Sequence, residues 1–324
     1  MPTFFKNNTN FTRYAWFVLA FLILVVLWGA FVRATGSGAG CGSHWPLCNG
    51  VVVPREPQIE TIVEFTHRVT SAFSGVLVLG MLFWAFRLFA KGHIVRRAAV
   101  YSTVFIITEG LVGAGLVLFE WVADNESVAR AISMAVHLVN TFLLLAAVAL
   151  TAWFSGMKGD YRLQLRGQGH AGRLTAGAVG LLLLLGVSGA ITALGDTLFP
   201  SGTLREGIAA DFASTAHFLV RLRVYHPIIA VVTSIYLWLA AGAIAAARPG
   251  IGALLFSNAI RVLVVVQLAA GVFNILLNVP VWMQLVHLLL ADLMWIAVVL
   301  LGAAALARPV EVVRPVALSP LPGD

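Results

Sequence analysis

Charged side chains are scarce in this sequence, and their scarcity limits the class of protein that it can encode. Only 11% of the 324 residues are Asp, Glu, Lys or Arg, whereas 60% are hydrophobic. A soluble globular domain carries about 25% charged residues. Apolar runs of about 20 residues recur instead, and this is the helix length that crosses a bilayer core about 30 Å thick. The composition therefore excludes a soluble domain and predicts an all-α integral membrane protein in a lipid bilayer.

Eight apolar runs are long enough to be transmembrane helices. We expect the spans at residues 14–33, 66–89, 98–120, 130–153, 174–194, 224–246, 259–279 and 284–306. The first run is longer than the apolar core of a signal peptide, and no Ala-x-Ala-like cleavage site follows it. It is therefore expected to be a span rather than a cleaved leader.

Lys and Arg are concentrated in alternate connections. On one side they are Lys6, Arg13, Arg87, Lys91, Arg96, Arg97, Lys158, Arg162, Arg166, Arg173, Arg248, Arg261, Arg308 and Arg314. The positive-inside rule makes this side cytoplasmic, together with both termini, and predicts a multi-pass protein of the cell membrane. The opposite loops hold most of the acidic residues. Because the basic residues are scattered over short loops, no nucleic-acid partner is expected.

The chain contains a weak internal repeat. "GAFVRATGSG" from Gly29 resembles "GAITALGDT" from Gly189, and "VHLVNTFLLL" from Val136 resembles "VHLLLADLMW" from Val286. We therefore expect two pseudo-two-fold-related four-helix bundles, at residues 1–153 and 174–306. A cytoplasmic linker (154–173) joins them, and a cytoplasmic tail (307–324) follows.

Four histidines occupy matching helices of the two halves. They are His67, His137, His226 and His287, in the second, fourth, sixth and eighth spans. All four lie toward the outer leaflet, and His137 is about 10 Å in from Arg130 at 1.5 Å per residue. One such histidine alone can be a hydrogen-bonded core residue. Four in symmetric positions indicate ligands, because unpaired polar groups in hydrocarbon are costly.

Two histidines from helices of one bundle can bind a haem iron from both faces. The expected pairs are His67 with His137, and His226 with His287. Zinc is the competing metal, but it favours a tetrahedral set that often includes Cys or carboxylate. The symmetric division into two pairs suits a flat macrocycle better.

The surroundings of the two pairs differ in charge. Glu64 lies three residues before His67, on the same helix face, whereas Arg223 stands at this position before His226. This difference is expected if one half performs chemistry and the other holds a fixed cofactor. A helix N-terminal acid is the simpler explanation of Glu64. Arg221 and Arg223, and Arg68 in the first half, can pair with haem propionates or simply reach toward the membrane surface.

Two further acids lie within spans, namely Glu109 in the third and Asp292 in the eighth. Acids in membrane spans are functional candidates. For Asp292, a polar contact with Asn274 or Asn278 of the seventh span is the simpler alternative.

Taken together, "GSGAGCGSHWPLC", "EFTHR", "HLVNTFLLL" and the single histidines of the sixth and eighth spans resemble the haem A synthase family over nearly the whole chain. The resemblance implies oxidation of the C8 methyl group of haem O to the formyl group of haem A by successive hydroxylations, for terminal cytochrome oxidases. It implies that His226 and His287 bind a permanent haem b. It also implies that His67 and His137 bind the substrate haem beside Glu64, whose role is proton transfer or charge stabilisation. The haem O would be delivered by a haem O synthase.

Two departures from the family pattern stand out. Some members have a second cysteine pair in the outer loop of the second half, whereas residues 195–223 contain none. Glu109 stands where a neutral residue such as Gln is expected. A di-haem cytochrome b for electron transfer and a haem transporter or chaperone are the alternative functions. The electron acceptor, the oxygen source and the existence of a homo-oligomer are left open.

The two cysteines, Cys41 and Cys48, both lie in the first outer loop. Thiols oxidise outside the cytoplasm, the two residues are close in sequence, and the glycines around them permit a turn. We therefore expect a disulfide. It either staples the loop or acts as a redox-active pair over the first haem site.

Overall fold

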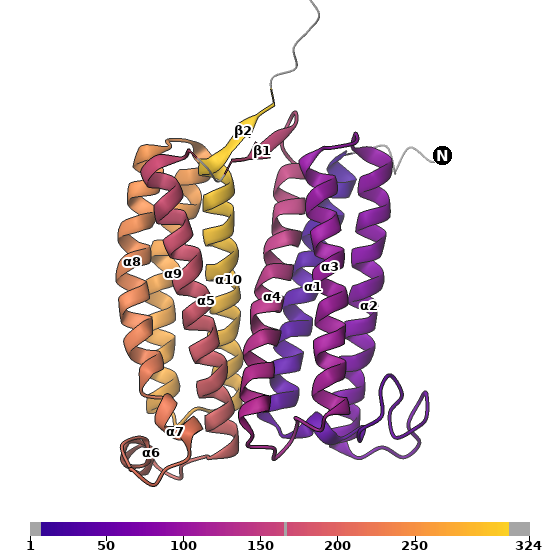
Figure 1. The fold of residues 1–324 in the computed structure, drawn as a ribbon, viewed down its shortest axis with the longest axis vertical. Coiled ribbons are helices and arrows are strands. Elements are labelled where there is room, and N and C mark those ends of the chain that lie inside the picture. Colours follow the sequence, from indigo (N-terminus) through magenta and orange to yellow (C-terminus); the bar gives the residue numbers. More distant parts are fainter. Residues whose placement is uncertain (1–7, 165–166, 311–324) are drawn as a thin grey trace, which may run out of the picture.

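The computed structural model describes residues 8–164 and 167–310, and helices make up most of it (Figure 1). Eight spans are long and apolar enough to cross a membrane. They are α1 (Asn8–Ala34), α2 (Ile59–Leu88), α3 (Ile94–Leu118), α4 (Val128–Ser155), α5 (Gly169–Leu198), α8 (Tyr225–Ala247) with the short α7 (Phe218–Leu222) before it, α9 (Ile251–Leu276) and α10 (Val281–Leu306). The predicted all-α membrane protein is confirmed. Lys6, Arg166, Arg314 and the tail beyond residue 310 lie outside the described residues.

Several helices extend beyond the apolar runs that predicted them. α2 begins at Ile59 rather than at residue 66, and α5 covers Gly169–Leu198 rather than 174–194. Hydropathy marks only the part of a helix that suits hydrocarbon, whereas backbone hydrogen bonding continues into polar residues. Local caps then set the ends. Ser127, for example, accepts a hydrogen bond from the backbone N–H of Arg130 at 3.2 Å and starts α4.

The spans form two groups of four that lie side by side (Figure 1). In one group α1 packs against α2 and α4, and α3 packs against the same two helices. In the other, α5 and α9 each pack against α8 and α10. The helices α2 and α4 are therefore diagonal to each other, as are α8 and α10. The pseudo-two-fold relation and the domain boundaries at 153 and 174 stay predictions.

The two groups meet where α5 and α10 pack against α1 and α4, and α10 is the most buried of the eight spans. It contacts α1 and α4 of the first group as well as α5 and α9 of its own. At its centre Trp295 stacks on Phe142 of α4 with ring centroids 4.9 Å apart. The indole N–H of Trp295 donates a 2.6 Å hydrogen bond to the carbonyl oxygen of Phe142. A single apolar core thus extends through both groups.

The two ends of the molecule differ in structure. At one end β1 (Tyr161–Leu163) pairs antiparallel with β2 (Ala307–Pro309), which joins the linker to the end of α10. The sequence did not predict this pair. The start of α1 lies at the same end (Figure 1). The two ends of the described chain and the linker thus share one end, as the predicted topology requires.

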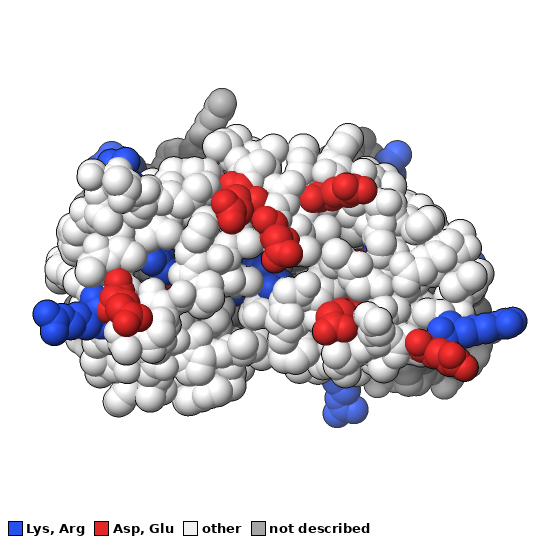
Figure 2. All heavy atoms as spheres, turned by 90° about the horizontal axis from the view of Figure 1, so that it is seen from below, with Lys and Arg blue, Asp and Glu red and all other residues white. Residues whose placement is uncertain are grey.

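The opposite end carries the long loops, with η2 (Ser37–Ala39) and α6 (Leu204–Asp211). Acidic side chains are spread over this face (Figure 2). The exposed ones in these loops and at the adjoining helix start are Glu56, Glu60, Glu120, Asp124, Glu126 and Glu206. This distribution agrees with the predicted topology, while the side of the membrane that this end faces stays a prediction.

Candidate functional site

The four histidines of the spans lie on the diagonal helices of the two groups. His67 is in α2 and His137 in α4, whereas His226 is in α8 and His287 in α10. The interior between diagonal helices of a four-helix group is where such bundles place cofactors. The assignment of the four histidines as two pairs of iron ligands stays a prediction.

The second pair has the spacing that a shared iron requires. The rings of His226 and His287 have centroids 6.4 Å apart, with an angle of 80° between their planes. Two axial imidazoles bound through nitrogens about 2 Å from one metal have centroids about 6 Å apart. The hydroxyl oxygen of Ser188 lies 2.9 Å from Nδ1 of His226, which leaves Nε2 of that ring for a metal. This pair fits a haem iron.

A glycine adjoins one ring of each pair. A Cβ atom on Gly29 of α1 would lie 2.8 Å from Cε1 of His67. A Cβ atom on Gly189 of α5 would lie 3.0 Å from Cε1 of His226. Real Cβ atoms essentially never approach other heavy atoms to 2.8 Å, and at 3.0 Å the ring must move by a few tenths of an ångström, so no larger residue fits beside either ring without a shift. In both groups, a glycine of the first helix thus packs against the first histidine, which is His67 in one group and His226 in the other.

The donor atoms come in pairs rather than larger clusters. Within the described residues, no three His, Cys, Asp or Glu side chains converge on a point that could hold a metal. Such pairs suit a metal whose remaining ligands belong to a macrocycle, and they do not supply the tetrahedral set that zinc prefers. Nδ1 of His67 and of His287 is buried without a hydrogen bond.

One carboxyl group lies beside an imidazole of the first pair. Oε1 of Glu109, in α3, is 3.3 Å from Nδ1 of His137. The sequence had identified Glu109 as a candidate without a partner. Only the packing of α3 against α4 brings it to His137.

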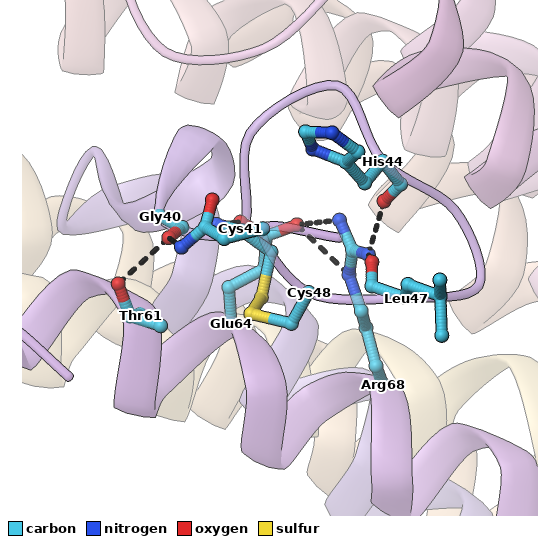
Figure 3. Close-up of a disulfide and its surroundings, with 9 residues drawn as sticks. Gly40, Cys41, His44, Leu47, Cys48, Thr61, Glu64 and Arg68 are labelled. Atoms are coloured by element: carbon cyan, nitrogen blue, oxygen red, sulfur yellow. Dashed lines mark hydrogen bonds and ion pairs between the residues drawn. A yellow bond between two sulfur atoms is a disulfide. The ribbon is translucent and has the colours of Figure 1, made fainter. Parts of the chain in front are cut away.

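Glu64 is buried, with 4% of its surface exposed, and it joins α2 to the cysteine loop (Figure 3). Its Oε2 accepts a 2.8 Å hydrogen bond from the backbone N–H of Cys41. Its Oε1 forms an ion pair with Arg68, one turn later in α2. Glu64 thus has two donors on the loop side of the helix that carries His67. Its catalytic role stays a prediction.

The predicted disulfide between Cys41 and Cys48 is confirmed. Its loop is held on α2 by further hydrogen bonds (Figure 3). The guanidinium of Arg68 donates to the carbonyl oxygens of His44 and Leu47, both at 2.6 Å. The hydroxyl of Thr61 donates to the carbonyl oxygen of Gly40 at 2.7 Å. The loop is therefore a fixed cover at this end of α2.

Arg223 forms two ion pairs in the second group. Its guanidinium lies 2.9 Å from Asp196 of α5 and 2.9 Å from Asp211 of α6. These contacts fasten the short α6 over the end of α5. Arg221 is exposed. The binding of haem propionates by Arg221 and Arg223 stays a prediction, and for Arg223 it requires the guanidinium to be shared with the two aspartates.

Asp292 is fully buried, and neither carboxyl oxygen has a hydrogen-bond partner among the described residues. The contact with Asn274 or Asn278 that the sequence offered as an alternative is therefore wrong. The amide of Asn278 donates to the carbonyl oxygen of Ser201 instead. Asn278 follows the end of α9, where the loop carrying Ser201 is the nearer partner.

Arg33 was not identified from the sequence, although it links the two groups. From α1 it donates to the carbonyl oxygen of Ala193 at 2.5 Å and to the hydroxyl of Thr197 at 2.6 Å, both in α5. It also donates to the side-chain oxygen of Gln284 in α10 at 3.1 Å. Its place inside a predicted span was the one available signal, because an arginine there needs partners.

The chain is similar to proteins of haem metabolism. The model of the family described as cytochrome oxidase assembly protein, COX15-CtaA, matches residues 12–299. A protoheme IX farnesyltransferase of Thermus thermophilus is 51% identical over 295 residues, which are 91% of this chain and 48% of that protein. The heme A synthase of Halalkalibacterium halodurans is 43% identical over 98 residues, or 30% of this chain and 33% of that protein.

The heme A synthase of Alkalihalophilus pseudofirmus is 38% identical over 129 residues, or 40% of this chain and 41% of that protein. The chain spans about half the length of the Thermus relative and a smaller share of the two heme A synthases.

Proposed function

This chain belongs to the COX15-CtaA family of cytochrome oxidase assembly proteins, and we propose that it is a haem A synthase. It would oxidise the C8 methyl group of haem O to a formyl group by two successive hydroxylations and loss of water, a four-electron oxidation that takes its oxygen from water or dioxygen and passes its electrons to an external acceptor or to dioxygen. The observation that carries the proposal is the pair of histidines on diagonal helices in each four-helix group. The similarity to two heme A synthases supports the reaction.

The two groups would have different tasks. In the second, His226 and His287 would hold a permanent haem b, and the 6.4 Å between their ring centroids supports this assignment. When bound, that haem supplies one-electron redox capacity. In the first, His67 and His137 would hold the substrate haem. The carboxyl group of Glu109, 3.3 Å from Nδ1 of His137, supports this division, because a substrate that changes needs acids and bases within reach.

Glu64 would act on the substrate side of the first group. Its position three residues before His67 places it on the same face of α2. The backbone N–H of Cys41 and the guanidinium of Arg68 both donate to it. The carboxylate would hold or transfer a proton, or stabilise positive charge that develops on the substrate.

The loop that contains Cys41 and Cys48 would cover the first site. Its hydrogen bonds to Thr61 and Arg68 support a stapled lid. A redox role of the disulfide remains the sharper alternative, in which the pair accepts electrons from the substrate.

The haem O would come from a farnesyltransferase that makes it. The protoheme IX farnesyltransferase of Thermus contains a segment similar to 91% of this chain, with about half of its length outside the match. This supports close contact between the two activities. The product would go to cytochrome oxidase assembly. The protein would lie in the cell membrane with both termini cytoplasmic.

Pigment analysis tests the proposal. The full chain is co-expressed with a haem O synthase, and the extracted haems are separated. Haem A, with or without its hydroxymethyl precursor, is the expected result. Haem B alone, in two equal sites, would contradict it and indicate a di-haem cytochrome b. Unchanged haem O in the first site would indicate a transporter or chaperone.

A further inference from the structure

A polar network surrounds His137 in the first group. The Asn140 side-chain amide and the Thr141 hydroxyl both hydrogen-bond the carboxyl group of Glu109. Asn140 also donates to the carbonyl oxygen of Phe105 at 2.9 Å and accepts from the hydroxyl of Thr108 at 2.6 Å. Glu109 is thereby held in place from α4 as well as from its own helix.

The carboxyl group of Glu109 is directed at one atom of the histidine. Its Oε1 lies 3.3 Å from Nδ1 of His137. This contact falls short of hydrogen-bond geometry, and no other described group bonds that nitrogen. The amide of Asn140 donates to Oε2 of Glu109, whereas the single hydroxyl proton of Thr141 is shared between Oε1 of Glu109 and the carbonyl oxygen of His137. An N–H at Nδ1 would leave Nε2 of His137 for a metal.

The second group has a neutral residue at the matching position. "EGLVG" from Glu109 in α3 corresponds to "QLAAG" from Gln267 in α9. Gln267 also approaches a histidine, with its amide nitrogen 3.3 Å from Nε2 and 3.1 Å from the carbonyl oxygen of His287. An amide brings no charge to the ring.

The residues that follow these histidines also differ, because they are polar in the first group and apolar in the second. Three residues after His137 is Asn140, and Thr141 follows it, whereas Leu290 and Ala291 stand at these positions after His287. At these two positions α10 is therefore apolar, and its next residue is the buried Asp292, which has no hydrogen-bond partner among the described residues. The asymmetry involves two helices and three positions, and it is centred on one histidine.

A carboxylate that accepts from the free N–H of a metal-bound imidazole raises the basicity of that ligand. A more basic ligand stabilises the oxidised metal more than the reduced metal. The amide of Gln267, which approaches Nε2 of His287 rather than Nδ1, is neutral and lacks this effect. Hydrogen bonding around an axial ligand is one of the means by which proteins set the potential of haem.

We propose that Glu109 is a positioning residue for His137, and that it keeps the iron of the first group at a lower reduction potential than Gln267 allows in the second. The inference rests on the proposed function, in that it requires a haem between His67 and His137. The two sites of one chain would then have different redox properties, and the main difference between them would be Glu109 in one and Gln267 in the other.

The test is a redox titration of the purified full chain loaded with haem B in both groups, followed by visible absorption. A His226→Ala background isolates the first site, and a His67→Ala background isolates the second. Glu109→Gln is expected to raise the ratio of reduced to oxidised iron at the first site at least tenfold at fixed potential, which is about 59 mV for one electron. Gln267→Glu is expected to lower that ratio at the second site, and the bound haem per chain stays the same in both variants.

The inference is wrong if the ratio of reduced to oxidised iron at the first site of Glu109→Gln stays within twofold of the parent value while haem is still bound. Loss of haem without a shift in the remaining sites would also overturn it, because this shows a structural role alone. If single-site backgrounds fold poorly, the difference between the two potentials in the intact chain gives the same answer. That difference shrinks in Glu109→Gln if the inference holds, and it is unchanged if the inference is wrong.

The outcome is separable from the proposed reaction, because the titration needs no turnover. A shifted potential without haem A production would keep the role of Glu109 and reject the synthase. Haem A production with an unshifted potential would reject the role of Glu109 and keep the synthase. A parent chain that binds no haem in its first group would reject both.

Discussion

The backbone N–H of Cys41 donates a 2.8 Å hydrogen bond to the carboxyl group of Glu64. One buried acid therefore connects the disulfide loop with the helix that carries His67. The loop and the first histidine site share this residue, so changes at either one are expected to reach the other.

Glu64→Gln tests whether this acid takes part in chemistry. The amide retains the shape and one acceptor oxygen, so haem content is expected to stay at the parent level. Haem A yield is expected to fall about 100-fold if the carboxylate moves a proton. Both are measured by haem extraction. Glu60→Gln, an exposed acid in the first turn of the same helix, is the matched control and should keep full yield. Full yield in Glu64→Gln would remove this acid from the reaction.

Cys41→Ala tests the function of the disulfide as a staple. Opening a ring this small is expected to lower the local unfolding free energy of the loop by about 2 kcal/mol. Limited proteolysis between the ends of α1 and α2 measures the loss as faster cleavage. If haem A output is normal while cleavage is faster, the disulfide has only the structural function of stabilising the loop. Loss of haem A with cleavage at the parent rate would point to redox chemistry of the pair.

Gly29→Ala and Gly189→Ala test the seating of the two histidines. Their new methyl groups would lie 2.8 Å from His67 and 3.0 Å from His226, so each ring must move. Each variant is expected to lose haem affinity about tenfold or more at its own site only, as measured by bound haem per chain.

Gly75→Ala is the control for the first site, because it lies on α2 and nothing stands within 4 Å of its added Cβ. Parent haem content in Gly29→Ala, or equal losses in Gly29→Ala and Gly75→Ala, would show that the close approach to the ring has no bearing on binding.

Arg33→Met tests the link between the two groups. The substitution keeps much of the side-chain volume but leaves acceptors on α5 and α10 unpaired. The free energy of unfolding in detergent is expected to fall by about 3 kcal/mol. Chemical denaturation measures it, and Arg205→Met, at an exposed position, is the control. Equal stability of the two variants would show that the hydrogen bonds of Arg33 do not hold the two groups together.

Much of the fold was predictable because membrane insertion is a local property of the chain. A run of apolar residues without charge crosses the bilayer whatever surrounds it. The spans, the four histidines and the cysteine pair were therefore found from sequence. The helix ends were less accurate, since caps such as Ser127 and extended helix starts such as Ile59 do not alter hydropathy. The small β pair was missed, because each of its strands has three residues and no pattern of its own.

The partners of polar residues were beyond the reach of the sequence. Arg33 and Gln284 are 251 positions apart, and Trp295 and Phe142 are 153 apart. The direction of a side chain depends on helix rotation, and rotation is set by packing against several neighbours at once. The same limit applied to Asp292, for which the expected asparagine partner is absent among the described residues.

The sequence by itself determined that the chain spans the membrane, which helices carry the histidines, and that its only two thiols can meet. These properties follow from composition and from short-range spacing. The tertiary structure alone decided that the histidine helices are diagonal, that Glu64 binds the cysteine loop, and that Glu109 lies beside His137 while Gln267 lies beside His287. These relationships arise where helices distant in sequence pack together, and the energy that selects them belongs to the assembled bundle.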